Sequence, residues 1–540
     1  MSPDSAPSVT EVSRAGFTHR QQVWDSLLAG EGIYDLVVVG GGIIGAGVLR
    51  EAARRGLRVL LVEQQDFAWG TSSRSSKMVH GGLRYISQGD IALTKHSLQE
   101  RERLLREAPG LIDRMGYYFT LRKGQFPGRL PFTLLLKLYD RLAGIKNHRY
   151  HSNKSLACTY PGLDERGLKG AMYYTDTVTD DARLVLRVLQ EAQTAGGEAL
   201  NYVKADSLVF SEGQLAGLRL RNVETDETVQ LDCPTVISAT GAWADQLRNE
   251  INPEKRIRPL RGSHLVFAAE RLPAPEALTL FHPKDKRPVF VFPWEGTTVV
   301  GTTDLDHTAP LDEEPAISAQ ELDYLLEALE ALFPQHKLGR DDVVSTWSGV
   351  RPVIGSEESK DPSKERRDHA VWNDHGLITV SGGKLTTFRL IALDALRAAN
   401  GTLPSIEEDP DNTAVFAPLT VSAADLPSND EYWGRRLLGR YGDAAKRMLE
   451  EASESERLQI PGTLFCLAEC RWALRNEAVA HLDDLLLRRT RLGSILPNGA
   501  SELFKSLQVM CAEELGWEEE RWAQERTRYE SIWQRCYGLP

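Results

Sequence analysis

Residues 35–63 constrain the fold of this chain more than any other stretch. They read DLVVVGGGIIGAGVLREAARRGLRVLLVE, with apolar runs at 36–39 and 59–62 on either side of a glycine turn and a segment of helical spacing. This order predicts a strand, a turn, a helix and a second strand, which together make a βαβ unit. We therefore expect an α/β chain that contains a Rossmann-like domain.

The turn carries a dinucleotide-binding pattern, G-x-G-x-x-G, formed by Gly40, Gly42 and Gly45. The first glycine lets the chain reverse, the second lets backbone approach a pyrophosphate, and the third packs the helix on the strand. The start of the helix then offers free N–H groups to phosphates. Glu63 ends the second strand 18 residues after Gly45, where a carboxylate accepts a ribose 2′-hydroxyl. These features predict a dinucleotide cofactor and leave the choice between NAD and FAD open.

The loop after the second strand favours FAD. Residues 67–85 read FAWGTSSRSSKMVHGGLRY, a long run of small and hydroxyl residues that a nicotinamide site does not need. An extended FAD needs hydrogen-bond donors along its whole length. The segment GTSSxSSKxxHGGLRY resembles the FAD-dependent, quinone-linked glycerol-3-phosphate dehydrogenase family, whose pattern the related glycerol-3-phosphate oxidases share. The resemblance extends from about residue 33 to about residue 535.

The chain, at 540 residues, is too long for one core, so we expect several domains. The resemblance implies a Rossmann-like FAD-binding domain of the D-amino-acid-oxidase and glutathione-reductase type, a β-rich substrate domain that forms an α+β cap, and a C-terminal helical domain. The expected division is a tail and short helix over 1–30, the FAD-binding domain over 31–110, 171–250 and 371–405, the substrate domain over 111–170 and 251–370, and the helical domain over 410–540.

Periodicity and turn residues predict several elements inside these domains. Helical spacing is present at 91–107 and, over a longer stretch, at 464–491. Strand alternation with intervening turn residues predicts a β-meander over 207–232 and a hairpin that joins 289–293 to 299–303 around Glu295-Gly296. From about residue 410 onward the pattern becomes almost wholly helical.

Two later motifs bring the chain back to the cofactor. A predicted strand ends in Thr240-Gly241-Ala242-Trp243, and another is followed by a Gly382-Gly383 turn at the start of a helix, again an anion-receiving N-terminus. The resemblance implies that FAD is bound by residues of all these motifs: Gly40, Gly42, Ile44, Gly45, Glu63, Thr71, Ser72, Ser76, Lys77, His80, Gly81, Gly82, Val203, Gly241, Trp243, Gly383, Lys384, Leu385 and Thr386.

The expected substrate is anionic. A phosphorylated alcohol carries about two negative charges, so its site needs several fixed cations. Arg84, Arg351, Arg367 and Lys384 each lie in or beside a motif that the family shares, and Tyr85 adds a hydroxyl donor. Because the sequence neighbours of Arg84 and Arg351 are largely apolar, an idle charge there would be costly. We therefore assign these five residues to substrate binding.

The resemblance implies oxidation of sn-glycerol 3-phosphate to dihydroxyacetone phosphate, with hydride transfer from C2 to N5 of FAD and electrons passed on to a membrane quinone. For catalysis we rank Arg351 and Lys384 first and His264 third. His80 and His264 are both candidates for the base, because histidine titrates near working pH. The sequence does not decide between them.

Three other functions are weighed against this one. An oxidase that reduces O2 to H2O2 differs only in its acceptor, which the sequence barely shows. Oxidation of amines or amino acids would not need four cations. A catalytically idle flavin-binding sensor would have no reason to keep the glycines, Glu63 and the cationic set together.

Residues 129–145 form an amphipathic stretch with two interpretations. Four leucines fall on one stripe and three charged residues opposite: Leu134, Leu135, Leu138 and Leu142 against Lys137, Asp140 and Arg141. The pattern fits a packed surface helix, and it also fits an anchor that lies in the plane of a membrane. The resemblance favours the anchor, because quinone-linked members are peripheral membrane enzymes.

Composition narrows the setting. A net charge of −12 argues against nucleic acid as a partner, and no run of 18 apolar residues is present to span a membrane. An N-terminus without an apolar segment argues against secretion, and six cysteines suit a reducing cytoplasm. Cys466 and Cys470 lack further ligands nearby, so we expect no metal site. We expect a cytoplasmic protein, peripheral on the cytoplasmic face of a membrane; a homodimer is compatible with the sequence.

Overall fold

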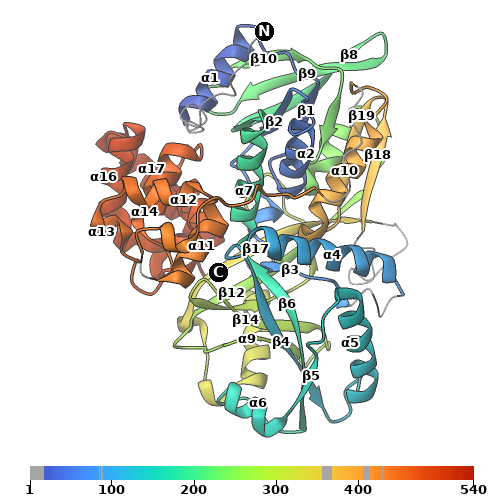
Figure 1. The fold of residues 1–540 in the computed structure, drawn as a ribbon, viewed down its shortest axis with the longest axis vertical. Coiled ribbons are helices and arrows are strands. Elements are labelled where there is room, and N and C mark those ends of the chain that lie inside the picture. Colours follow the sequence, from blue (N-terminus) through green and yellow to red (C-terminus); the bar gives the residue numbers. More distant parts are fainter. Residues whose placement is uncertain (1–16, 84–85, 87–88, 356–367, 405–412, 429) are drawn as a thin grey trace.

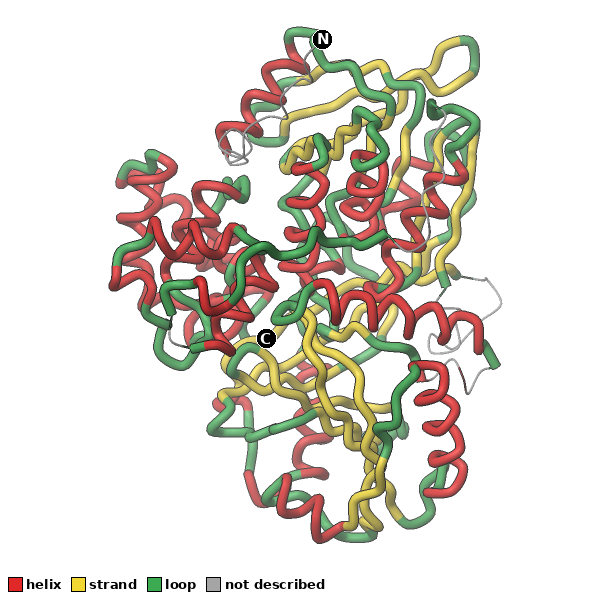
Figure 2. Tube along the Cα trace, viewed as in Figure 1, coloured by secondary structure: helices red, strands yellow, loops and turns green. Residues whose placement is uncertain are grey.

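The computed structural model describes residues 17–83, 86, 89–355, 368–404, 413–428 and 430–540. A six-stranded sheet with flanking helices fills the upper half of the view, a larger sheet fills the lower half, and the C-terminal helices form a block beside both (Figure 1). Figure 2 shows that this last block is almost entirely helical. The predicted α/β class with a β-rich domain and a C-terminal helical domain is confirmed.

The predicted βαβ unit is β1 (Leu36–Val39), α2 (Ile43–Ala53) and β2 (Val59–Glu63). Within the described residues the sheet has the order β18-β19-β11-β1-β2-β7, and all neighbours are parallel except β18 and β19. The other strands are β7 (Glu198–Asn201), β11 (Val236–Ser238), β18 (His369–Asp374) and β19 (Leu377–Gly382).

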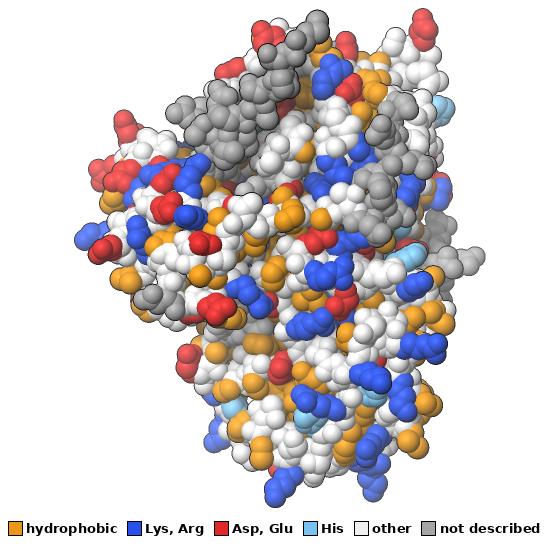
Figure 3. Space-filling view, in the orientation of Figure 1, with side chains coloured by type: hydrophobic (Ala, Val, Ile, Leu, Met, Phe, Trp, Pro, Cys, Tyr) orange, Lys and Arg blue, Asp and Glu red, His pale blue; other side chains and the backbone are white. Residues whose placement is uncertain are grey.

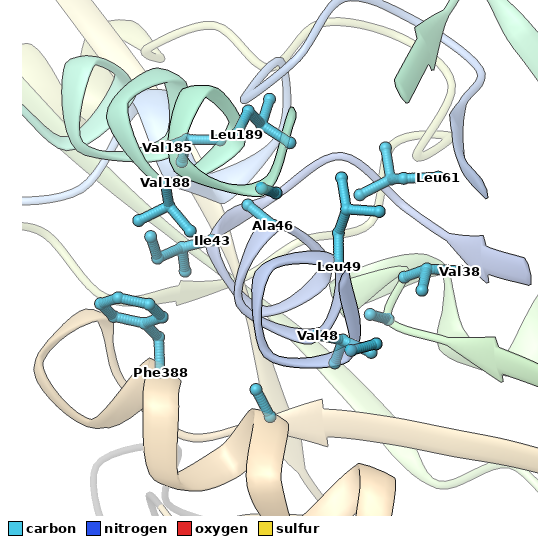
Figure 4. Close-up of a cluster of buried hydrophobic side chains, with 14 of the residues drawn as sticks. Val38, Ile43, Ala46, Val48, Leu49, Leu61, Val185, Val188, Leu189 and Phe388 are labelled. Atoms are coloured by element: carbon cyan, nitrogen blue, oxygen red, sulfur yellow. The ribbon is translucent and has the colours of Figure 1, made fainter. Parts of the chain in front are cut away.

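Helix α2 is buried between the sheet and two other helices, α7 (Asp181–Thr194) and α10 (Phe388–Ala398). Figure 4 shows Ile43 and Ala46 of α2 directed toward Val185 and Val188 of α7, with Phe388 of α10 nearby. These side chains are almost fully removed from water, and burial of each one larger than alanine contributes about 1.5–3 kcal/mol. The packing holds the start of α2 in a fixed position above the glycine turn.

The predicted meander is confirmed as the antiparallel strands β8 (Val203–Ser211), β9 (Gln214–Asn222) and β10 (Thr228–Asp232). The predicted hairpin is confirmed as β14 paired with β15, and the helix at 91–107 is α4. The helices before the C-terminal domain are α1 (Phe17–Leu28), α2, α4 (Ile91–Glu107), α5 (Arg129–Ala143), α6 (Asn153–Thr159), α7, α8 (Ala244–Arg248), α9 (Ala319–Leu332) and α10.

The larger sheet has the order β16-β12-β15-β14-β13-β4-β6-β3 in the described chain, with β17 paired to β12 and β5 to β6. Its strands are β3 (Met78–Val79), β4 (Ile112–Arg122), β5 (Arg149–Ser152), β6 (Leu168–Thr179), β12 (Ile257–Ala268), β13 (Ala277–Phe281), β14 (Pro288–Trp294), β15 (Thr297–Gly301), β16 (Leu305–Asp306) and β17 (Val343–Ile354). Because β6 runs through the expected boundary at residue 170, we propose to move that boundary to the start of α7.

The C-terminal helices are α11 (Glu431–Tyr441), α12 (Ala444–Glu451), α13 (Glu454–Arg457), α14 (Leu467–Asn476), the π-helix η8 (Asp484–Arg489), α15 (Leu492–Ile495), α16 (Phe504–Leu515) and α17 (Glu519–Cys536). The long helical periodicity at 464–491 does not give one helix. The Asp484 carboxylate accepts backbone N–H groups of Ala480 and His481, both at 2.9 Å, and so stabilises a new helix start. The apolar residues before and after this break pack into the same core, which is why the sequence pattern runs across it.

The structure corrects the expected faces of α5. Phe132, Leu136 and Tyr139 are buried, whereas Leu134 is 67% exposed. Asp140, expected on the solvent face, is buried because the following loop folds back on it: its Oδ2 accepts the N–H groups of residues 147 and 148, at 2.9 and 3.1 Å. Of the described helices, none has both the length and the apolar content to cross a membrane.

Candidate cofactor and substrate site

The glycine turn between β1 and α2 forms one wall of a cavity. Gly40 has a left-handed backbone, with φ 112°, which lets the chain reverse at the end of β1. A Cβ on Gly45 would lie 1.8 Å from the carbonyl oxygen of Gly40, so only glycine allows α2 to approach the strand. The Ile43 N–H donates to Ser72 Oγ at 3.0 Å and thereby ties the start of the helix to the next loop.

Glu63 ends β2 at the edge of the same cavity. Its Oε2 accepts the Gly41 N–H at 2.7 Å, and its Oε1 accepts the Gln65 N–H at 2.9 Å. Burial raises the pKa of Glu63, and the two backbone N–H groups oppose that rise. The carboxylate is thus fixed in place at the position predicted to receive a ribose hydroxyl.

The cavity brings together predicted cofactor residues from segments far apart in the sequence. Those that line it are Gly40, Gly42, Ile44, Glu63, Thr71, Ser72, Val203, Gly241, Trp243, Gly383, Lys384 and Leu385. They supply a carboxylate, a helix N-terminus, hydroxyl groups and an indole, which are the groups that an extended FAD requires. The chain therefore has a lining that fits FAD.

Sequence reasoning missed several other lining residues, among them Trp69, Gln246, Glu250 and Pro352. Gln246 and Glu250 follow Trp243 at helical intervals, and this spacing was a usable signal for a shared face. Trp69 lies in the quoted loop, and its ring centroid is 5.8 Å from that of Trp243.

Other residues predicted to bind the cofactor support the cavity without lining it: Gly45, Ser76, Lys77, His80, Gly81, Gly82 and Thr386. The Gly81 N–H donates to Asp176 Oδ1 and to the Tyr139 hydroxyl, both at 3.1 Å. The His80 N–H donates to Thr386 Oγ1 at 3.0 Å. These contacts fix the turn formed by His80, Gly81 and Gly82.

Lys77 is one of these supporting residues. Its Nζ donates to the Asp181 carboxylate at 2.8 and 3.0 Å and to the Ser73 carbonyl at 2.5 Å, between the rings of Trp294 and Trp347. Burial lowers the pKa of Lys77 to about 7, with the neighbouring Arg491 charge acting in the same direction. The ammonium group therefore has a protein carboxylate as its partner.

Arg351 lies on β17 next to the cavity-lining Pro352. Its Nη2 donates to Thr302 Oγ1 at 3.3 Å, and its Nη1 lies 3.6 Å from Asp304 Oδ1. The argument from apolar sequence neighbours was wrong, because alternate residues of a strand face opposite sides and the guanidinium reaches polar groups. A Cβ on Gly262 would lie 2.8 Å from Nη2, so this glycine makes room for the guanidinium.

His264 lies on β12, the strand paired with β17. Its Nε2 is 2.9 Å from Ser76 Oγ, and its ring stacks on Trp347 with centroids 5.0 Å apart. Burial holds the pKa of His264 well below its usual range, and the Arg351 and Lys77 charges lower it further. The imidazole is therefore neutral, fixed and close enough to Arg351 to feel its charge.

Lys384 lines the cavity after two glycines with left-handed backbone, at φ 81° and 75°. Arg84, Tyr85 and Arg367, the remaining predicted substrate residues, lie outside the described residues. Cys466 and Cys470 are buried, and burial raises the pKa of the Cys466 thiol to about 12. In the described ranges no group of three or more potential ligands is placed to hold a metal.

Two family models match this chain over the segments that form the site and the C-terminal helices. A model described as FAD dependent oxidoreductase covers residues 35–389, and one described as C-terminal domain of alpha-glycerophosphate oxidase covers residues 417–522. The aerobic glycerol-3-phosphate dehydrogenase of Staphylococcus aureus (strain USA300) is 33% identical in an alignment of 488 positions that covers 85% of this chain and 86% of that protein. The chain belongs to the FAD-dependent glycerol-3-phosphate dehydrogenase family. FAD is accordingly its cofactor, and the lining of the cavity fits it.

Solved structures agree with this assignment. The glycerol-3-phosphate dehydrogenase from Bacillus halodurans complexed with FAD is 28% identical, with a TM-score of 0.77, over 97% of this chain and 98% of that one. The L-alpha-glycerophosphate oxidase from Mycoplasma pneumoniae with FAD bound shares the fold at 17% identity, a TM-score of 0.56 and coverage of 72% and 99%. The chain is thus an FAD-dependent enzyme of the glycerol-3-phosphate dehydrogenase and oxidase group.

A pH-dependent stability should follow from the burial of neutral His264. Below about pH 6.5 the unfolded chain takes up a proton that the folded protein refuses, so stability falls as the pH is lowered. When the pH is lowered from 7.5 to 5.5, the free energy of unfolding of His264→Gln should fall by about 1 kcal/mol less than that of the wild type. Urea unfolding at both pH values measures this. His96→Gln, on the exposed face of α4, is the control, and an equal loss in all three proteins would contradict the expectation.

Proposed function

We propose that this enzyme oxidises sn-glycerol 3-phosphate to dihydroxyacetone phosphate and passes the electrons to a membrane quinone. The observation that carries the proposal is that Arg351 and the neutral, buried His264 lie on the paired strands β17 and β12, and that Pro352, next to Arg351, lines the FAD cavity. The names of the relatives support the substrate, since both the S. aureus protein and the B. halodurans structure are glycerol-3-phosphate dehydrogenases.

Each residue has a distinct task in this proposal. Arg351 and Lys384 supply positive charge for the anionic substrate, and Arg351 can also stabilise the developing oxyanion. His264, anchored by Ser76 through Nε2 and kept neutral by burial, takes the C2 hydroxyl proton. When bound, FAD supplies the acceptor for the two electrons that leave the substrate carbon.

An anaerobic spectrum with added sn-glycerol 3-phosphate tests the reaction. The substrate should bleach the flavin band, while the sn-1 enantiomer and glycerol serve as controls and should not. An unchanged spectrum would contradict the proposal and favour a flavin-binding sensor. Admission of air to the reduced enzyme then separates the two acceptors. Slow reoxidation of the flavin supports a dehydrogenase. Fast reoxidation that produces H2O2 supports an oxidase, the activity named in the description of the second family model.

A surface of exposed apolar and basic side chains supports the quinone as acceptor. Phe126, Leu130 and Leu134 project from α5 and the preceding loop with 83, 78 and 67% of their surface exposed. Exposed basic residues adjoin them: Lys123, Arg129, Lys137, Arg141 and Lys146. Figure 3 shows basic and apolar side chains gathered over this lower part of the molecule. We propose that this surface lies on an anionic bilayer, which places the protein on the cytoplasmic face.

Leu130→Glu combined with Leu134→Glu should release the protein from lipid without unfolding it. Both side chains are exposed, so the fold loses little, whereas the membrane loses two apolar contacts worth roughly a hundredfold in binding. Flotation with vesicles that contain anionic lipid measures the change. Leu458→Glu with Val509→Glu, also exposed, is the control on the C-terminal domain. Equal flotation of the two double variants would exclude α5 as the contact surface.

A further inference from the structure

One loop of the FAD cavity is held at both ends by buried carboxylates. Residues 69–72 of this loop line the cavity. Asp66 precedes them in the chain, with its side chain fully buried. Asp181, at the start of α7, accepts the Ser75 N–H at 2.9 Å and the Ser75 hydroxyl at 2.6 Å, in addition to the Lys77 ammonium group. The loop at 66–77 therefore depends on two carboxylates for its position.

Arginines of the C-terminal domain form ion pairs with both carboxylates. The Arg489 guanidinium donates to the two oxygens of Asp66 at 2.7 and 2.8 Å, and Arg488 Nε donates to the same carboxylate. Arg491 donates to Asp181 through Nη2 and to Asp180 through Nε at 2.9 Å. The arginine side chains are at most 4% exposed, so solvent does not screen these pairs.

The segment that carries these arginines has unusual backbone. η8 is a π-helix, a geometry that is rare and frequent at functional sites. Its wide turn lets the adjacent residues Arg488 and Arg489 reach one carboxylate. Arg491 itself has left-handed backbone, with φ 64°, which a residue with a side chain adopts only when its surroundings impose it. Buried ion pairs are poor general stabilisers, so their concentration around this loop points to a positioning task.

We propose that Arg488, Arg489 and Arg491 are positioning residues that clamp the loop at 66–77 onto bound FAD. The C-terminal domain then controls cofactor release, because the loop cannot open while Asp66 in the loop and Asp181 on α7 both hold the arginines. The same clamp sets the position of His264, whose Nε2 partner Ser76 lies in the loop. The inference rests on the FAD cavity and does not depend on the identity of the substrate.

Cofactor release from the holoenzyme tests the clamp. Arg491→Met should release FAD at least tenfold faster than wild type, measured as free flavin that passes a size-selective filter over time. Arg436→Met is the matched control: Arg436 is similarly buried, joins the C-terminal domain to Glu295 and pairs with Glu469 inside that domain, but it contacts neither Asp66 nor Asp181. Release from the control should stay within twofold of wild type. Equal release from the two variants would overturn the proposal.

A second measurement uses the wild type alone and so does not depend on a variant that folds. Thermodynamic linkage requires that FAD also tighten the clamp. Amide hydrogen exchange should therefore be slower at 484–491 with FAD than after its removal, while α11 at 431–441 exchanges alike in both states. A change shared equally by the two segments, or no change at 484–491, would overturn the proposal. The first experiment reads out cofactor release and the second amide exchange, and neither depends on turnover, so both remain informative even if the proposed substrate is wrong.

Discussion

Arg351→Ala should yield a yellow, FAD-loaded protein that sn-glycerol 3-phosphate reduces at least tenfold more slowly. The variant removes a charge-assisted contact worth about 1.5–3 kcal/mol, and the rate falls further if that contact tightens in the transition state. Arg351→Lys should recover only part of the rate, because an ammonium group on a flexible stem does not reproduce the planar fork. Stopped-flow flavin reduction at limiting and saturating substrate measures both effects.

Arg271→Ala is the matched control for this prediction. Arg271 follows β12 in the chain and pairs with Asp342, and its side chain is 38% exposed. Its loss should leave flavin reduction unchanged. If the flavin of Arg351→Ala were also reduced at a rate within twofold of wild type at both substrate concentrations, the guanidinium would have a structural role beside Thr302 and Asp304 and no role in the reaction.

Gly42→Val should abolish FAD binding and give a folded, colourless protein. In the described chain, the near neighbour of a Cβ on Gly42 is the side-chain oxygen of Ser72, at 3.1 Å, and the fold should tolerate the change if this side chain shifts by a few tenths of an ångström. The added methyl groups instead occupy the space that the cofactor pyrophosphate needs. The ratio of flavin to protein absorbance after purification should fall nearly to zero, while circular dichroism stays close to that of wild type.

Gly339→Val serves as the control for this experiment. Gly339 has extended backbone, and a Cβ there would meet no described atom within 4 Å beyond its chain neighbours. This variant should purify with wild-type flavin content. Flavin retained by Gly42→Val at the wild-type ratio would mean that the turn at 40–45 does not receive the pyrophosphate.

Local sequence signals predicted the elements that depend on local interactions. The helix at 91–107 and the hairpin around Glu295 were predicted from periodicity and turn residues alone, and both are present. Gly40, Gly42 and Glu63 likewise line one cavity, because the βαβ unit that carries them folds from adjacent residues.

Features that depend on distant partners could not be predicted in this way. The environment of Lys77 is set by Asp181, 104 residues away, and nothing near Lys77 in the sequence announces that carboxylate. The buried state of Asp140 depends on the loop that follows α5, and helical spacing does not show which face that loop covers. The break before η8 does not show in the sequence, because apolar residues on both sides of it pack against the larger sheet and so follow one another without a gap in the pattern.

Two glycines in the larger sheet bear on any attempt to make this protein more heat-resistant. Replacement of glycine by alanine usually stabilises a protein where the backbone permits it, and neither Gly262 nor Gly301 has left-handed backbone. Yet a methyl group at Gly301 would lie 2.2 Å from the His264 ring, just as one at Gly262 would crowd Arg351. A stabilisation campaign guided by backbone angles alone would therefore accept two positions where an added methyl group displaces His264 or Arg351, and we expect alanine there to disturb the proposed site without raising the melting temperature.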